Sequence, residues 1–276
     1  MLPNVLAAAG FHIFFQFIIF QLYLLRHMED IVCYAYTHRM LPDIHHEVPC
    51  QFIFDHYIHM LHSASDSWFK IEFRMTRATF NALRFRIEAE EVEQIVGRPR
   101  LRLEMRLAIF LFRMAHRLSV RAMCHHFGVE KSVITRASLG LLNIFIGPLA
   151  LEEIRMPRTA EDLKKCADDF VAANGAFKNC VGVLDGCHVR VATSNDAYYN
   201  HKQFRSINSV FVSDANGLFV FVSAGAAGSV HDARVLRNTR LWAKQKEDKK
   251  LIPPPYYLLA DSAYPLRHWL ITKHSR

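Results

Sequence analysis

The sequence predicts an α/β protein in which a helical region precedes a sheet. Between residues 68 and 155, apolar residues recur with the spacing of amphipathic helices. From residue 180 onward, runs of β-branched and aromatic residues alternate with turn signals, in the order strand, hairpin of two strands, helix, strand. We therefore expect a hydrophobic and histidine-rich N-terminal region (1–67), a helical region (68–155) and a sheet-bearing domain (156–276).

Length and composition agree with a folded protein. The chain has 276 residues, of which 51% are hydrophobic and 22% charged, enough for one large domain or two small ones. Its net charge of +8 favours a polyanionic partner without excluding other kinds. The six cysteines contain no C-x-x-C pair, which indicates a reducing compartment rather than a disulfide framework.

Residues 5–25 contain no Lys, Arg, Asp or Glu and are long enough to span a bilayer. His12, Gln16 and Gln21 interrupt this run, and the start lacks the basic residues and the cleavage site of a signal peptide. We expect a hydrophobic helix packed on the protein, or a misassigned start, with a membrane span as the open alternative.

Residues 38–64 are rich in histidine. His56, His59 and His62 could share one face of a helix. No cysteine or carboxylate completes a set of ligands at zinc spacing. We therefore expect histidines that are exposed or hydrogen-bonded within the protein, rather than a metal site.

Two amphipathic helices are predicted after Trp68. Thr76 is suited to cap the first, whose apolar face consists of Phe80, Leu83 and Ile87. A basic break at 97–100 precedes the second. Its apolar side consists of Leu103, Leu107, Phe110, Leu111 and Met114.

Residues 119–139 have the pattern of a helix-turn-helix. Ser119 is suited to cap a short helix, and Gly128 stands where that helix must end in the left-handed conformation. A second helix then has Val129, Val133 and Ala137 facing inward. Its outward residues, of types that contact phosphates and base edges, are Lys131, Ser132, Thr135 and Arg136. A plain helical corner remains the alternative.

The domain from residue 156 begins with a helix that Thr159 and Asp162 cap reciprocally. An apolar strand over 181–191 follows and breaks at Asp185-Gly186. A carboxylate at the end of an apolar strand is costly unless something pairs with it. The partner is either a metal ion or the backbone N–H groups of a turn.

An aromatic and basic loop is predicted over 198–208. Strands over 209–214 and 218–223 then form a hairpin around 215–217. Residues 225–228 lead to a predicted helix that Ser229 caps and that has Asp232 in its first turn. A last strand over 256–260 ends on Asp261.

Several of these segments resemble the DDE endonuclease domain of PIF/Harbinger transposases and of the domesticated nucleases derived from them. The segments are 184–189 (Leu-Asp-Gly-Cys-His-Val), 199–202 (Tyr-Asn-His-Lys), 206–208 (Ser-Ile-Asn), 228–232 (Gly-Ser-Val-His-Asp), 260–266 (Ala-Asp-Ser-Ala-Tyr-Pro-Leu) and 269–272 (Trp-Leu-Ile-Thr). The upstream Phe-Arg-Met at 73–75 and the helix-turn-helix match in kind and order, so the resemblance covers about residues 68–276.

The resemblance implies an RNase H-like mixed sheet and metal-dependent cleavage of DNA ends. Asp185 matches the first catalytic carboxylate of the family and Asp261 the second, while Ala260 stands where the family often has Gly. No residue before Arg276 matches the third, a Glu on a later helix. We therefore expect a truncated member with an incomplete sheet and little or no cleavage activity. Asp214 and Asp232 are given turn and helix-cap roles.

The physical reason for such a site is independent of the family. Two divalent ions about 3.5–4 Å apart can activate a water and stabilise the leaving oxygen of a phosphodiester. Mg²⁺ and Mn²⁺ suit carboxylate oxygens, so Asp185 and Asp261 are the expected metal ligands. Lys202 and Arg205 are expected either to contact phosphate or to be ordinary solvated charges.

The leading prediction is a transposase-derived, metal-dependent DNA endonuclease, although the sequence leaves its activity undecided. The alternative is a catalytically dead protein that binds DNA or a partner. A Myb-like DNA-binding partner is implied by the resemblance, a homo-oligomer is left open, and the nucleus is the expected location.

Overall fold

The computed structural model describes residues 51–90, 101–116, 118–247 and 251–272. The predictions for residues 5–25 and for the break at 97–100 lie outside these residues. The chain divides into two compact units, whose described parts are a helical unit up to Leu151 and a sheet unit from Glu152. Each unit is described by itself.

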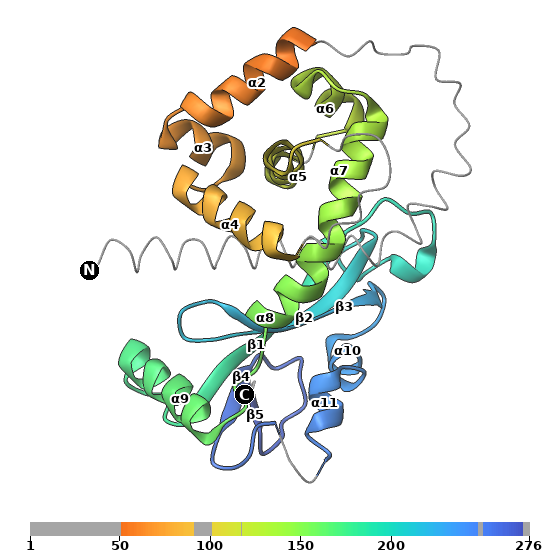
Figure 1. Ribbon diagram of the computed structural model, residues 1–276. Coiled ribbons are helices and arrows are strands. Elements are labelled where there is room, and N and C mark those ends of the chain that lie inside the picture. Colours follow the sequence, from red (N-terminus) through yellow and green to blue (C-terminus); the bar gives the residue numbers. More distant parts are fainter. Residues whose placement is uncertain (1–50, 91–100, 117, 248–250, 273–276) are drawn as a thin grey trace. The chain divides into compact units, whose positions relative to one another are not determined.

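The helical unit surrounds one central helix. Its elements are α2 (Gln51–Ser63), α3 (Asp66–Phe73), α4 (Arg77–Glu90), α5 (Leu103–His116), α6 (Val120–Phe127), α7 (Lys131–Ile144), η1 (Phe145–Leu149) and the start of α8 (Ala150–Glu153). Figure 1 shows α5 end-on, with α2, α3, α4, α6 and α7 around it. The helix is buried on all sides because Met105 and every residue over 107–112 are buried.

The predicted cap of α4 is confirmed. The Thr79 N–H donates to the Thr76 hydroxyl at 3.2 Å, and the predicted face is buried, with Phe80 3% exposed and Leu83 and Ile87 fully enclosed. Capping satisfies one of the N–H groups that a helix leaves unpaired at its start.

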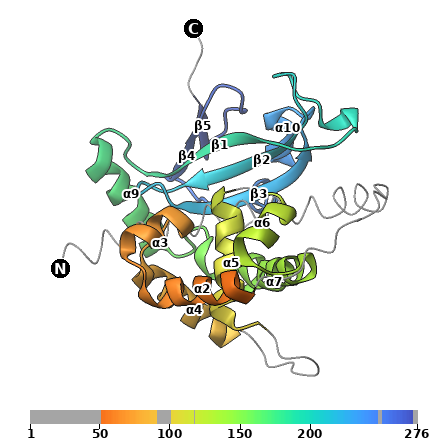
Figure 2. The ribbon, with the colours of Figure 1, turned by 90° about the horizontal axis from the view of Figure 1, so that it is seen from above.

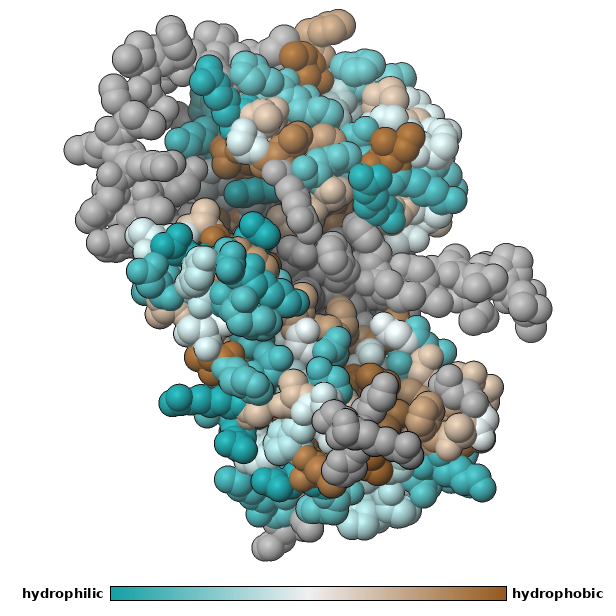
Figure 3. Space-filling model, turned by 180° about the vertical axis from the view of Figure 1, so that it is seen from behind, coloured by the Kyte–Doolittle hydropathy of each residue, from teal (hydrophilic) through white to brown (hydrophobic). Residues whose placement is uncertain are grey.

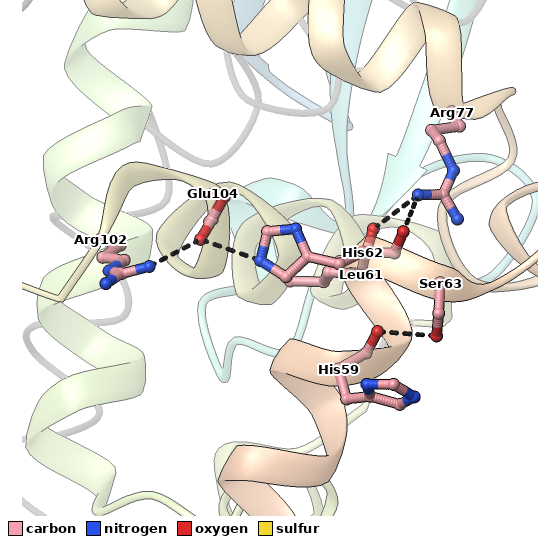
Figure 4. A network of polar contacts seen from close by, with 7 residues as sticks. All are labelled: His59, Leu61, His62, Ser63, Arg77, Arg102 and Glu104. Atoms are coloured by element: carbon pink, nitrogen blue, oxygen red, sulfur yellow. Dashed lines mark hydrogen bonds and ion pairs between the residues drawn. The ribbon is translucent and has the colours of Figure 1, made fainter.

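Polar contacts hold the histidine-rich helix α2 at its carboxyl end (Figure 4). The Arg77 guanidinium donates to the carbonyls of Leu61 (3.2 Å) and His62 (2.5 Å), and also to that of Ala64. Glu104 lies 3.6 Å from His62 and 3.8 Å from the guanidinium of Arg102.

The three histidines predicted to share one face of α2, His56, His59 and His62, are all exposed. The helix is therefore a surface element, as the sequence predicts. Its last carbonyls need partners outside the helix, and Arg77 supplies them.

The helical run Lys131–Glu153 is long and apolar enough to cross a membrane by length and composition. Core helices of folded proteins also meet this criterion. Here Leu141 and Phe145 are fully buried, and the Phe145 ring stacks on Phe110 of α5 at 4.8 Å. The run therefore packs its apolar side against the central helix of its own unit.

The sheet unit contains five strands in the order β3-β2-β1-β4-β5. The strands are β1 (Cys180–Arg190), β2 (Ser206–Ser213), β3 (Phe219–Ala227), β4 (Tyr257–Ala260) and β5 (Leu270–Thr272). The helical elements are α9 (Ala160–Asn174), η2 (Asp196–Tyr198), α10 (Asp232–Arg237) and α11 (Arg240–Lys244). The β1–β2 and β2–β3 pairs are antiparallel, whereas β1–β4 and β4–β5 are parallel. A helical region followed by a mixed sheet is what the sequence predicts.

Helices bury the apolar sides of this sheet. In both views α9 and α10 lie to opposite sides of β4 and β5 (Figures 1 and 2). The shared core includes Leu163 of α9, Leu184 of β1, Val210 of β2, Leu236 of α10 and Leu258 of β4. The predicted capping box at the start of α9, between Thr159 and Asp162, is confirmed.

Hydrophobic side chains that reach the surface are scattered. Figure 3 shows separate hydrophobic patches among hydrophilic residues on one face of the molecule. Phe52 and Leu151 belong to the helical unit and are 80% and 75% exposed, while Leu266 and Ile271 of the sheet unit are about half exposed. Single exposed apolar residues of this kind are normal on folded proteins.

The prediction that the first strand breaks at Asp185-Gly186 is wrong. Strand β1 runs without interruption, because Asp185 pairs with Phe211 and Gly186 with Val210 across the antiparallel ladder. Two boundaries also differ from the prediction. Strand β2 begins at Ser206 rather than 209, and β3 continues to Ala227 rather than ending at 223.

The predicted hairpin is confirmed, but the cap of the following helix is not. The Asp214 carboxylate accepts the N–H groups of Asn216 (2.9 Å) and Leu218 (2.8 Å) in the turn. Helix α10 is capped by His231, whose ring nitrogen accepts the N–H of Ala233 at 3.3 Å, rather than by Ser229.

Candidate active site

Strand pairing brings together the two aspartates that the sequence singled out. In the parallel ladder of β1 and β4, Leu184 pairs with Ala260. The next residue on each chain is an aspartate, Asp185 on β1 and Asp261 after β4, and both are exposed. They are therefore neighbours at the carboxyl end of β4, which is the placement that two ligands of one metal ion need.

Backbone N–H groups orient both carboxylates. The Asp185 carboxylate accepts the N–H of Gly186 at 2.7 Å, and the Asp261 carboxylate accepts the N–H of Ala263 at 3.2 Å. Each of these bonds involves one oxygen. Since a carboxylate has two oxygens and about four lone pairs, each can accept further ligands.

Gly186 leaves room for two more polar groups beside Asp185. A Cβ atom at Gly186 would lie 2.8 Å from the hydroxyl oxygen of Tyr264 and 3.4 Å from Cγ of Asp232. A glycine inside a strand often marks such a close approach. The Asp-Gly pair is therefore a point of side-chain convergence rather than a turn, and Asp232 approaches Gly186 in addition to starting α10.

The charges of three aspartates act on the Tyr264 hydroxyl. The side chain is 4% exposed, and in the described part of the chain its hydroxyl has no hydrogen-bond partner. Burial, followed by the charges of Asp232, Asp185 and Asp261, raises the pKa of the Tyr264 phenol far above its usual value. The phenol therefore stays protonated and available as a hydrogen-bond donor.

Asn208 of β2 holds Asp232 in place. Its side-chain amide donates to the Asp232 carboxylate at 2.7 Å and to the Val230 carbonyl at 2.9 Å. Asn208 is fully buried, so these bonds form where water is excluded. The sequence reading included both residues in its motifs but assigned neither to the site.

A second network of hydrogen bonds joins residues from three other motifs. The ring of His188 lies 2.9 Å from the Ser206 hydroxyl, and the Asn200 side-chain amide donates to the same hydroxyl at 2.8 Å. Ser206 and Asn200 are buried. Segments that are far apart in the sequence thus meet along β1 and β2.

The charge of Lys202 acts on two residues of β1, Cys187 and His188. Burial of the Cys187 thiol, followed by the charge of Asp185, raises its pKa, whereas Lys202 acts in the opposite direction. Lys202 also helps to lower the pKa of His188, after burial and against the effect of Asp232. Lys202 is exposed, and its predicted phosphate contact remains a prediction.

Arg205 has a partner within the chain. Its guanidinium donates to the Asp196 carboxylate at 2.7 Å, so its charge is already shared with an acid. The predicted phosphate contact of this residue remains a prediction.

Sequence comparison connects this geometry to a known family. Residues 184–276 match the DDE superfamily endonuclease family. The matched segment contains Asp185, Asp232 and Asp261. The N-terminal helical unit lies outside it.

Comparison with individual proteins also finds similarity to a nuclease, at modest identity. The chain is homologous to the protein named "Putative nuclease HARBI1", with 29% identity to the Mus musculus protein over 148 residues, 52% of this chain and 41% of that relative. The Xenopus laevis protein of that name is 30% identical over 150 residues, again 52% and 41% of the two chains. "Protein ALP1-like" of Arabidopsis thaliana is 24% identical over 233 residues, 77% of this chain and 56% of that relative. The chain thus spans about two fifths of the HARBI1 proteins, and no solved structure matches it significantly.

The donor set of the segment that matches the DDE superfamily endonucleases fits a hard cation. Among the described residues, no three His, Cys, Asp or Glu side chains already converge as the ligands of one metal ion. Mg²⁺ is usually bound by one or two carboxylates together with waters and substrate phosphates, rather than by a complete protein cage. Asp185 and Asp261, each with oxygen to spare, fit a Mg²⁺ or Mn²⁺ site of this open kind.

The predicted helix-turn-helix has the expected local geometry in the helical unit. The Ala122 N–H donates to the Ser119 hydroxyl at 3.2 Å, α6 ends at Gly128 with φ of 63°, and α7 begins at Lys131. The four residues predicted to point outward are exposed: Lys131, Ser132, Thr135 and Arg136.

The predicted inner face of α7 is only partly correct. Val129 and Val133 are half-buried, whereas Ile134, which the prediction omitted, is fully buried together with Ala137. The helix is rotated slightly from the expected position, and its outward face is unchanged.

Proposed function

We propose that the protein is a transposase-derived, metal-dependent DNA endonuclease. The single observation that carries this proposal is the position of Asp185 and Asp261. They follow paired positions of adjacent parallel strands, within the segment that matches the DDE superfamily endonucleases. The nuclease name of the HARBI1 relatives supports the same activity.

In the proposed mechanism, Asp185 and Asp261 hold Mg²⁺ or Mn²⁺. When bound, such a cation polarises the phosphate and lowers the pKa of a water molecule. The Gly186 and Ala263 N–H groups keep the two carboxylates oriented. Lys202 binds a phosphate beside the site, and Arg205 contributes once DNA competes with Asp196 for its guanidinium.

Contact with the rest of the DNA is proposed for the exposed face of α7. Lys131 and Arg136 bind backbone phosphates there, and Ser132 and Thr135 lie on the same face. DNA as substrate, a Myb-like partner protein, a homo-oligomer and a nuclear location complete the proposal. The net charge of +8 is consistent with a nucleic acid as partner.

A cleavage assay tests the proposal. The 276-residue chain is incubated with supercoiled plasmid DNA and Mg²⁺ or Mn²⁺, beside the variants Asp185→Ala and Asp168→Ala. Asp168 is an exposed acid on α9 and serves as the matched control. We expect slow nicking by the native chain and the control, since the sequence predicts a weak nuclease, and loss of nicking in Asp185→Ala.

A second candidate is a catalytically inactive protein that binds DNA or a partner. The observation that favours it is the exposed basic and hydroxyl face of α7, because binding through that face does not depend on the metal site. Salt-sensitive DNA binding by the native chain without any metal-dependent nicking would establish this alternative and reject the nuclease.

A further inference from the structure

A carboxylate and a hydroxyl lie beside Asp185 without a part in the mechanism above. A Cβ atom at Gly186 would meet the Tyr264 hydroxyl oxygen at 2.8 Å and Asp232 Cγ at 3.4 Å. The Asp185 carboxylate accepts the Gly186 N–H at 2.7 Å, which links the first acidic residue of the proposed site to the residue that both groups approach. The packing excludes any larger residue from position 186 without displacing them.

Two buried polar atoms around Asp232 have no partner in the described part of the chain. They are the Tyr264 hydroxyl, on a side chain 4% exposed, and the side-chain carbonyl of Asn208, on a residue that is fully buried. Asn208 uses its amide group to hold the Asp232 carboxylate at 2.7 Å. Buried polar groups without partners often have an ordered water or an ion as their partner.

We propose that Asp232 and Tyr264 together hold a water ligand of the divalent cation that Asp185 and Asp261 bind. The Tyr264 hydroxyl and the Asp232 carboxylate would both hydrogen-bond to that water, and Asn208 fixes Asp232. Asp232 is then a positioning residue and the third acidic group of the site. This inference rests on the proposed function, because it requires the cation of that same site.

The arrangement explains two features of the site. Binding through water requires no third side chain to ligate the cation directly, in agreement with the absence of a three-residue cage among the described residues. It also gives the unpaired Tyr264 hydroxyl a partner.

Mn²⁺ binding by the 276-residue chain, measured by isothermal titration calorimetry, tests the inference without relying on cleavage. In Asp232→Asn the amide oxygen still accepts from Asn208, so the structural contact is kept while the charge is lost. Outer ligands of a metal typically contribute about 10–100-fold to its affinity, so we expect Mn²⁺ affinity to fall by about that factor.

Asp214→Asn is the matched control. It removes the same charge from the sheet unit, and asparagine also forms turns of the kind in which Asp214 accepts the Asn216 and Leu218 N–H groups. We expect its Mn²⁺ affinity to stay at the native value. A folded Asp232→Asn protein that binds Mn²⁺ as tightly as the native chain would overturn the inference.

Tyr264→Phe tests the hydroxyl alone, and keeps the inference falsifiable should Asp232→Asn fail to fold. We expect Mn²⁺ affinity to fall by about three- to tenfold. If the hydroxyl held no water on the cation, its removal would leave Mn²⁺ affinity unchanged and raise the melting temperature, since a buried unpaired group would be gone. That result would also overturn the inference.

Asp185→Asn separates the inference from the function on which it rests. Loss of Mn²⁺ affinity in Asp185→Asn, with native affinity in Asp232→Asn and Tyr264→Phe, would reject the inference and leave the proposed metal site standing. Native affinity in Asp185→Asn as well would reject both.

Discussion

Each unit of the protein buries a tyrosine beside acidic groups, but the two surroundings differ in charge. In the helical unit, Tyr57 is 6% exposed, and burial, followed by the charge of Glu72, raises the pKa of its phenol. Glu72 has basic neighbours, since the charges of His116 and Arg74 oppose the rise that burial causes in its pKa. The charges that act on Tyr264 of the sheet unit are those of three aspartates instead.

The two surroundings differ in whether the chain itself supplies the opposite charges. The acid of the helical unit is matched by basic side chains of the chain itself, so its charges can be balanced without a ligand. Among the described residues, the charges that shift the pKa of Tyr264 are all acidic, and Lys202 acts on the neighbouring His188. Such an imbalance is relieved by a cation from outside, which is the physical argument for a metal site there.

The largest expected effect is on cleavage. Asp185→Ala should lower the rate of Mg²⁺-dependent nicking by about a hundredfold or more, because a displaced cation cannot align the attacking water. Glu72→Gln removes an acid from the helical network and should leave nicking within about twofold of the native rate. Equal losses in the two variants would remove the distinction between the clusters.

The next effect is on stability. Gly186→Ala should lower the free energy of unfolding by about 1–3 kcal/mol, because the added Cβ would overlap the Tyr264 hydroxyl. Gly140→Ala, in α7 of the helical unit, has open space around it and should raise that energy by about 0.5–1 kcal/mol. Urea unfolding followed by circular dichroism measures both, and a neutral Gly186→Ala would contradict the close packing of this site.

A third test concerns DNA binding by the helical unit. Replacing Lys131 and Arg136 together by alanine should lower the slope of log affinity against log salt by about 2, since each lost phosphate contact reduces the slope by about 1. Fluorescence anisotropy of a labelled duplex measures this slope. The double variant Lys164→Ala with Lys165→Ala removes the same charge from exposed positions of α9 and should leave it unchanged. An unaltered slope in the first variant would identify α7 as a plain helical corner.

The smallest effect is the pH response of the helical network. Burial, followed by the His116 charge, lowers the pKa of His126, so stability should fall as pH decreases from 6.5 toward the lowered pKa of the folded state. Burial raises the pKa of Glu72, which acts in the opposite direction, because protonation stabilises the folded state as pH falls toward 4.5.

The two contributions can be separated by mutation. His126→Gln should reduce the fall in melting temperature between pH 7.5 and 5.5 by about 1–2 °C, measured by calorimetry. No change in this fall would show that His126 does not titrate in that window.

Much of the fold could be predicted because its signals are local. A helix start depends on one side chain that reaches back to an N–H group a turn away, as Thr76, Ser119 and Thr159 do. The prediction was wrong at Asp185-Gly186, where a turn signal lies inside a continuous strand. The pairing partners on β2 override the local preference there, and such partners are distant in the sequence.

The sequence by itself determined the order of elements and the two aspartates that follow β-rich segments, because periodicity and residue type act over a few neighbours. Only the tertiary structure decided that Asp232 and Tyr264 join them. Asp232 begins a helix and Tyr264 follows β4, so no spacing in the sequence relates either to Gly186. Their convergence depends on the register of β1 against β2 and β4, and on the absence of a side chain at position 186.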